Sequence, residues 1–116
     1  MIKMIYSWII LNDNEFCKVI DKSVIETKES GIPQEAIYLF DLQEEYKNIK
    51  LIFNKEIFEA KLTTKTYKGS TRSKIRFASF INEIKHFIKI NDIIYFNKLD
   101  TYTYEVKTLR CIDLSK

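Results

Sequence analysis

The sequence predicts a mainly β domain with about seven strands and two short helices, built around a mainly antiparallel sheet that curls or closes. Runs rich in β-branched and aromatic residues alternate with turn clusters, as expected for short strands. Only two segments have helical spacing, and they fall between groups of strands without the regular alternation of a parallel sheet. With 116 residues, 46% hydrophobic and 30% charged, the chain has the size and composition of one folded domain, residues 1–116.

The expected strands are short and end at polar turn residues. Asn12-Asp13-Asn14 separates the first two strands, and Asn54-Lys55 separates the next two. After Asn54-Lys55, polar and apolar residues alternate, which predicts one exposed and one buried face. This strand continues extended to Gly69, and a loop is expected at Ser70–Ser73. The seven expected strands are Met4–Leu11, Glu15–Asp21, Asn48–Phe53, Glu56–Thr63, Ile75–Phe77, Ile93–Phe96 and Tyr102–Cys111.

Two helices are expected, one before and one after the central strands. Pro33 suits the first turn of a helix, and apolar residues follow it at helical spacing to about Gln43. The second helix begins near Ala78 or Ser79, since apolar residues recur three and four positions apart as far as Ile88. The stretch Lys22–Gly31 has a mixed, polar composition that indicates no regular element.

The chain has the sequence features of an intracellular protein. Its apolar start, Met1–Leu11, is much shorter than the ~20 residues that a membrane span needs, and it lacks a small-residue cleavage site. Cys17 and Cys111 are too few and too far apart for a disulfide framework, and each lies in an apolar run, which predicts buried reduced thiols. We therefore expect a cytoplasmic protein with no membrane partner. Whether the two cysteines ever pair stays open.

The positive charge is concentrated in one segment. The formal net charge is only +3, yet residues 61–76 contain six basic residues and no acidic one. The other 100 residues carry 13 basic and 16 acidic side chains. The same segment has four threonines, two serines and Tyr67, whose hydroxyl groups can donate to phosphate oxygens or base edges. This composition predicts a nucleic-acid-binding arm. Its basic residues are Lys61, Lys65, Lys68, Arg72, Lys74 and Arg76.

A solvated edge strand that is protected by lysines is the alternative explanation of this segment. Two features favour a binding function. Of the three arginines in the chain, Arg72 and Arg76 lie here, and a guanidinium fork suits phosphate and guanine better than an ammonium group does. Gly69, one of only two glycines, lets the backbone approach another surface closely.

No constellation of residues indicates catalysis. The single histidine, His86, lies in the second expected helix without a serine and aspartate arranged around it. Glu59-Ala60-Lys61 is similar to the acid-x-lysine core of restriction-type nucleases, but Glu-x-Lys occurs five times in this chain and therefore carries no information. No four-ligand metal spacing is present. We expect a non-catalytic domain without a metal or cofactor.

Four segments follow one another in the order of a known family. They are Glu15–Val19 as a first strand, Gly31–Ala36 with its Ile-Pro before a helix, Tyr67–Gly69 leading to Arg72, and Phe77–Ile81 through Ile88–Phe96 as a helix, a turn and a strand. This order resembles the DNA-binding pseudobarrel superfamily, which includes the B-three domain of plant transcription factors and the effector domains of EcoRII-like and McrB-related restriction endonucleases. The resemblance covers about residues 15–110 and implies a seven-stranded open antiparallel pseudobarrel.

The resemblance also implies two arms that enter the major groove of DNA. The N-terminal arm corresponds to Thr27, Lys28, Glu29, Ser30 and Gly31, and the C-terminal arm to Lys68, Gly69, Ser70, Thr71, Arg72, Ser73 and Lys74. The second arm coincides with the basic segment, from which Lys65, Tyr67 and Arg76 are added as DNA contacts. Glu29 departs from a purely basic arm; it either accepts a hydrogen bond from a cytosine amino group or points away.

The sequence thus predicts sequence-specific binding of double-stranded DNA by the recognition module of a restriction system. On this interpretation the domain is the N-terminal part of a larger protein, and its further partners are the motor and nuclease domains or subunits of a restriction complex. Two other functions stay open: a protein-interaction or assembly domain whose basic strand meets an acidic partner, and an RNA-binding barrel. The RNA-binding function would require stacking aromatics, of which the basic arm contains only Tyr67.

Overall fold

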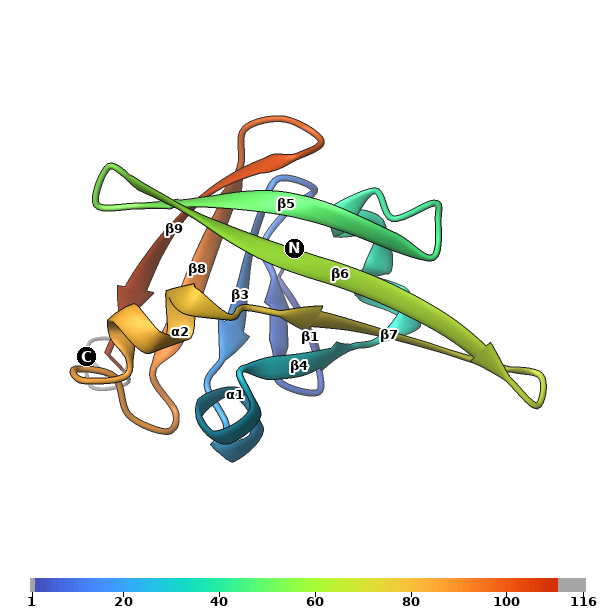
Figure 1. Cartoon of the computed structure of the whole chain (residues 1–116), viewed down its shortest axis with the longest axis horizontal. Helices are drawn as coiled ribbons and strands as arrows, with labels where there is room; N and C mark the ends of the chain where they lie inside the picture. Colours follow the sequence, from blue (N-terminus) through green and yellow to red (C-terminus); the bar gives the residue numbers. More distant parts are fainter. Residues whose placement is uncertain (1, 111–116) are drawn as a thin grey trace.

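The computed structural model describes residues 2–110 and shows a mainly β protein in which three short helices surround one curled sheet (Figure 1). None of the helices in this part of the chain is long and apolar enough to cross a membrane. In chain order the elements are β1 (Lys3–Ile5), β2 (Trp8–Ile10), β3 (Glu15–Val19), α1 (Lys22–Thr27), β4 (Glu29–Ile32), the 3-10 helix η1 (Gln34–Phe40), β5 (Tyr46–Phe53), β6 (Glu56–Tyr67), β7 (Ser70–Arg76), α2 (Ser79–Ile84), β8 (Ile93–Lys98) and β9 (Thr103–Leu109).

The described strands form one mixed sheet of nine strands in the order β1-β2-β3-β8-β9-β5-β6-β7-β4. Its neighbouring strands are antiparallel except for β5 and β9, which run parallel. The expectation of a seven-stranded antiparallel sheet is therefore wrong in strand number, and it is wrong in direction for the β5–β9 pair alone. A turn at Tyr6, where φ is 53°, divides Met4–Leu11 into β1 and β2, and Glu29–Ile32 adds β4. The direction of β9 is set by its hairpin with β8 before it meets β5.

The helices also differ from the prediction. The segment after Pro33 forms a 3-10 helix rather than an α-helix, and α2 ends at Ile84 instead of Ile88. Helix α1 lies in the stretch for which no regular element is expected. Its first residues are ordered by the carboxylate of Asp21, which accepts a hydrogen bond from the Val24 amide at 3.0 Å. Because Val24 is the one fully buried residue of this six-residue helix, α1 has no apolar periodicity that the sequence could reveal.

Strands β6 and β7 form a long hairpin, and Ser70–Ser73 is a strand segment rather than the expected loop. Their pairing continues to the tip, where Tyr67 lies opposite Ser70. The two turn residues, Lys68 and Gly69, have φ values of 50° and 79°, as a tight two-residue hairpin turn requires. The first half of β7 could not be recognised as a strand from the sequence, because it is polar on both faces and shows no alternation. Figure 1 shows the hairpin extending beyond the rest of the sheet.

The core of the curled sheet is aromatic. Trp8, Phe16, Phe40, Phe96 and Tyr104 are almost completely buried. The rings of Phe16 and Phe96 are stacked, with centroids 4.8 Å apart, and Phe40 meets Phe16 edge-on at 5.2 Å. These rings come from β2, β3, η1, β8 and β9, so the packing joins segments that are far apart in the sequence.

A side chain, not strand pairing, joins the two ends of the sheet. Strand β2 lies near one end of the strand order and β4 at the other. The indole nitrogen of Trp8 donates a hydrogen bond to the backbone oxygen of Gly31 in β4, at 2.9 Å. The sheet therefore curls into an open barrel whose gap is bridged by Trp8.

Replacing Trp8 with phenylalanine tests this bridge. The Trp8→Phe variant loses the hydrogen bond to Gly31 and leaves space beside Phe40, so we expect its free energy of unfolding to fall by about 2 kcal/mol. Urea unfolding followed by circular dichroism measures the change. The exposed Tyr6→Phe variant is the control and should stay within about 0.5 kcal/mol of the unsubstituted protein. Equal stability of Trp8→Phe and the control would show that the bridge contributes nothing.

Candidate nucleic-acid interface

The register of β6 and β7 sorts the hairpin side chains onto two faces. One face continues the core, and on it the buried Leu62 lies opposite the buried Ile75. Toward the tip the side chains of this face carry hydroxyl groups, in the pairs Thr64 with Ser73 and Thr66 with Thr71. On the other face the directly opposed pairs are Lys61 with Arg76, Thr63 with Lys74, Lys65 with Arg72, and Tyr67 with Ser70. We call this the basic face. It holds five of the six basic residues of the segment, and the sixth, Lys68, lies in the turn.

Like charges face one another across this hairpin. Lys61 lies opposite Arg76 and Lys65 opposite Arg72, an arrangement that destabilises a sheet. Edge protection does not explain the inner pair, because β5 and β4 flank the hairpin at Lys61 and Arg76. A surface that gathers charges of one sign in this way attracts ligands of the opposite sign, which are anions here.

The opposite face of the hairpin supplies the stabilising contacts. The Thr64 and Ser73 hydroxyl groups lie 2.6 Å apart, within hydrogen-bond distance, and the Thr66 and Thr71 hydroxyls lie 3.3 Å apart. These polar pairs continue the line of the buried Leu62–Ile75 pair toward the tip. The backbone ladder and this row of contacts hold the hairpin extended in spite of the repulsion on the basic face.

The N-terminal arm lies directly beside the basic face. Thr27 ends α1, Lys28 follows it in the left-handed conformation, and β4 then pairs with β7. This pairing places Glu29 opposite Arg76 and Gly31 opposite Lys74. The two arms, about 40 residues apart in the sequence, are therefore adjacent strands of one sheet.

A groove of about 690 Å³ runs between α1, β4 and the hairpin. Gly31 contributes no side chain to it, and a Cβ atom at that position would meet nothing within 4 Å. The groove is therefore open on the β4 side. Its lining residues are Ser23, Thr27, Glu29, Ser30, Gly31, Thr63, Lys65, Tyr67, Arg72, Ser73 and Lys74.

Most of the predicted site residues are brought together in this groove, and a minority lie elsewhere. Three of those outside the groove form the hairpin tip: Lys68, Gly69 and Ser70. Thr71 lies on the face that carries the hydroxyl pairs, and Arg76 lies at the base of the basic face. Lys28 caps the C-terminal end of α1. Sequence reasoning missed Ser23 and Thr63. Thr63 lies inside the basic segment, and the alternation of side chains along a strand could have placed it on the same face as Lys61 and Lys65. Ser23 lines the groove only because helix α1 forms, and this helix was not predicted.

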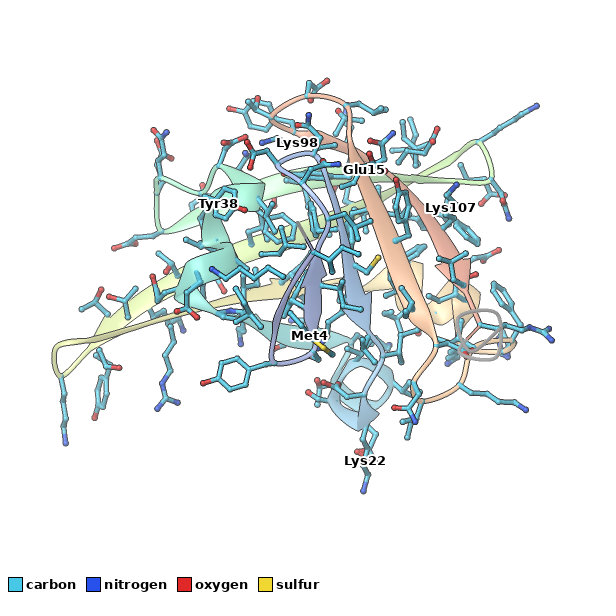
Figure 2. The ribbon with its side chains drawn as sticks, turned by 180° about the vertical axis from the view of Figure 1, so that it is seen from behind. Met4, Glu15, Lys22, Tyr38, Lys98 and Lys107 are labelled. Atoms are coloured by element: carbon cyan, nitrogen blue, oxygen red, sulfur yellow. The ribbon has the colours of Figure 1, made fainter. Side chains whose placement is uncertain are left out.

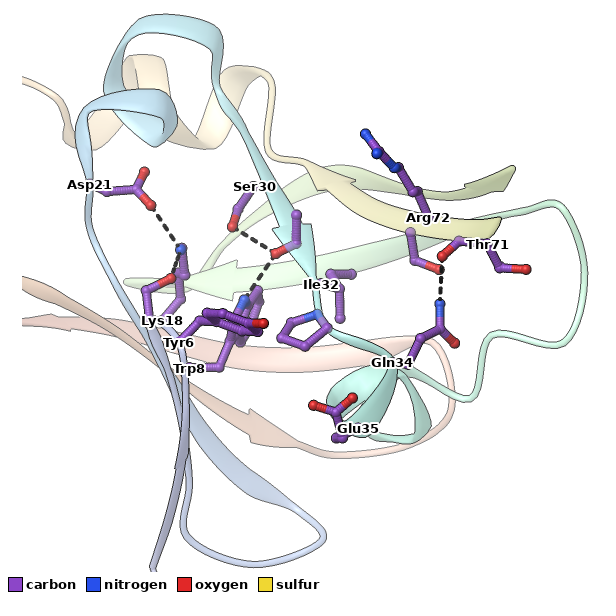
Figure 3. Close-up of a pocket in the computed structure, with 14 residues that line it drawn as sticks. Tyr6, Trp8, Lys18, Asp21, Ser30, Ile32, Gln34, Glu35, Thr71 and Arg72 are labelled. Carbon is purple, nitrogen blue, oxygen red and sulfur yellow. Dashed lines mark hydrogen bonds and ion pairs between the residues drawn. The ribbon is translucent and has the colours of Figure 1, made fainter. Parts of the chain in front are cut away.

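Both arms are tied to the body by contacts around a second pocket, lined in part by Tyr6, Lys18, Gln34 and Thr71 (Figure 3). The ammonium of Lys18 donates to the Ser7 hydroxyl and to the Asp21 carboxylate, and Asp21 caps α1. Burial lowers the pKa of Lys18, and its hydrogen bond with Asp21 partly offsets that effect. The Gln34 side-chain amide donates to the backbone oxygen of Thr71 at 3.1 Å. These contacts fix the base of the N-terminal arm to β3 and one strand of the hairpin to η1.

The histidine considered for catalysis and Cys17, expected to be a buried thiol, do not belong to the groove. His86 is exposed beyond the end of α2, and Cys17 is buried in β3, where burial raises the pKa of its thiol to about 11. Cys111 lies outside the described residues. Among the described residues, histidine, cysteine and carboxylate side chains form no cluster of three or more that could hold a metal ion.

Solved structures similar to this chain include the two described next, although no protein-family model matches it and no curated protein gives a significant match. The protein in the Arabidopsis FUS3–DNA complex superposes with a TM-score of 0.64 at 16% sequence identity, over 82% of this chain and 95% of that one. The N-terminal domain of Helicobacter pylori LlaJI.R1 superposes with a TM-score of 0.61 at 14% identity, over 83% of this chain and 80% of that one. Identities this low establish the fold alone. The open, curled β fold that the order of segments indicates is confirmed by both superpositions.

Proposed function

We propose that this domain binds double-stranded DNA sequence-specifically, with its two arms entering the major groove. The observation that carries the proposal is the basic face of the β6–β7 hairpin, which borders a groove shared with the N-terminal arm. The major groove of B-form DNA, ~12 Å wide, admits a two-stranded ribbon of this kind. The similarity to a protein solved with DNA supports the same function.

The groups on the two arms suit different parts of a duplex. Lysine and arginine side chains on the basic face would neutralise phosphates and release counterions, which supplies most of the affinity. Hydroxyl groups near the tip would donate to phosphate or base-edge acceptors. Arg72 both lines the groove and carries a planar fork, so it is the residue best placed to read a guanine.

We further propose that the domain is the non-catalytic recognition module of a restriction system. Motor and nuclease domains or subunits of the same complex would act on the DNA that this module selects. The order of segments shared with restriction effector domains supports this role, as does the fold shared with the LlaJI.R1 N-terminal domain. An acidic protein partner or single-stranded RNA remains the competing ligand. A titration with random duplex, single-stranded RNA and an acidic protein at two salt concentrations distinguishes the three.

The Arg72→Ala variant tests base reading by the hairpin. If the guanidinium is bidentate to a guanine, its loss should weaken binding to the selected site by about 1–3 kcal/mol and relax preference at that one position. Titration of selected and scrambled duplexes measures both effects. Equal loss on every sequence, or no loss, would show that Arg72 does not read a base.

The Lys65→Ala variant tests phosphate contact. Loss of one phosphate contact should weaken all duplexes to the same extent and reduce the slope of log K against log salt by about 1. Lys107→Ala is the matched control, because Lys107 lies on β9, far from the hairpin tip (Figure 2). The same slope for Lys65→Ala and for the unsubstituted protein would remove Lys65 from the phosphate contacts.

A further inference from the structure

One carboxylate lies among the cations of the groove. Lys65, Arg72 and Lys74 line it, and Glu29 is the one acidic side chain among the described residues that do so. The Glu29 carboxylate lies 2.9 Å from the Lys74 ammonium, and the two side chains are 27% and 49% exposed. Glu29 therefore points into the groove. A carboxylate at this place repels the phosphates that the cations attract, so it lowers the affinity for DNA as such.

The fold does not need this ion pair. Strands β4 and β7 already pair along the whole of Glu29–Ile32 through their backbones. An ion pair that remains partly exposed contributes at most about 1 kcal/mol to stability. The backbone pairing therefore leaves the Glu29 carboxylate available for a role in binding.

The ion pair matches the major-groove edge of a base pair. In a C·G pair the cytosine amino group donates to guanine O6 across ~2.9 Å, and each group keeps one hydrogen or lone pair facing the groove. The Glu29–Lys74 pair has the same spacing, with an acceptor beside a donor. The carboxylate can accept the free amino hydrogen while the ammonium donates to O6. All four groups then lie in one closed ring of hydrogen bonds.

The atoms that flank this edge favour C·G over A·T. An A·T pair also presents an amino group beside a carbonyl oxygen. However, adenine N7, an acceptor, would then lie beside the Glu29 carboxylate, and the thymine methyl group would lie beside the Lys74 ammonium. In a C·G pair the carboxylate meets only the cytosine C–H edge, and guanine N7 offers the ammonium a second acceptor.

We propose that Glu29 and Lys74 together read one C·G base pair and that Glu29 is a specificity-determining residue. The proposal rests on the DNA-binding function proposed above. Glu29 lowers binding to every duplex that places a phosphate or a base acceptor against it, and only an amino donor removes that penalty. The ion pair thus lowers the affinity for DNA in general and makes binding selective at one base-pair position.

Selection of duplexes from a random pool by the full chain and by its Glu29→Gln variant tests the proposal. Sites selected by the unsubstituted protein should contain a C·G position, and changing that pair should weaken its binding about 5- to 150-fold. The same change should weaken the Glu29→Gln variant less than about 2-fold, because a neutral amide can accept or donate. This variant should also bind random duplex several-fold more tightly than the unsubstituted protein.

Two further variants control for charge and for position. Glu29→Asp keeps the negative charge and should keep the weak binding to random duplex. Glu26→Gln neutralises a carboxylate on α1 that pairs with Lys22 at 3.8 Å and does not line the groove, and it should change neither affinity nor selectivity. Circular dichroism confirms that each variant is folded.

The outcomes separate this inference from the proposed function. If the unsubstituted protein binds no duplex, DNA binding itself is overturned. If it binds selectively and Glu29→Gln keeps the same preference at every position, the Glu29–Lys74 reader is overturned while DNA binding stands. An A·T preference at the affected position, or random-duplex binding by Glu29→Asp as tight as that of Glu29→Gln, also overturns it.

Discussion

The register between β6 and β7 is the constraint on which the candidate interface depends. It is held by the buried Leu62–Ile75 pair at one end and by the two-residue turn Lys68–Gly69 at the other. Because side chains alternate along a strand, this register sends five cations to one face. A slip of one residue would bury the cations of one strand and expose its apolar side chains, so the hydrophobic core also enforces the charge pattern.

Contacts elsewhere in the fold hold the two arms in place. Trp8 bridges β2 to β4, Lys18 joins β3 to the cap of α1, and Gln34 holds the backbone of Thr71. Each contact fixes one of the two arms without occupying the groove. The cations are therefore held close together before any anion arrives, and a ligand does not have to supply the free energy that ordering the arms would cost.

Glu29 makes the proposed interface more selective than a patch of cations alone would be. A surface of cations alone binds any polyanion with little selectivity, and its affinity follows the salt concentration. One carboxylate held at 2.9 Å from Lys74 introduces a site that favours a donor at one defined position. The same ion pair also links the two arms, so the geometry of the reader depends on the pairing of β4 with β7.

Three features could be predicted from the amino-acid sequence: the mainly β composition, the concentration of positive charge in residues 61–76, and the order of segments that indicates a pseudobarrel. These features are local: alternation, turn residues and charge can be read within a few positions. Three elements could not be predicted, because nothing periodic in the sequence marks them. Helix α1 begins at a capping carboxylate, and β1 and β2 are divided by one residue with a positive φ. The extension of β7 to Ser70 is polar on both faces. Three other features follow from the packing of the chain in three dimensions: β4 lies beside β7, Ser23 enters the groove, and Glu29 pairs with Lys74. Those contacts join residues about 40 to 50 positions apart, and they arise from the closure of the sheet around its aromatic core rather than from any preference of the residues themselves.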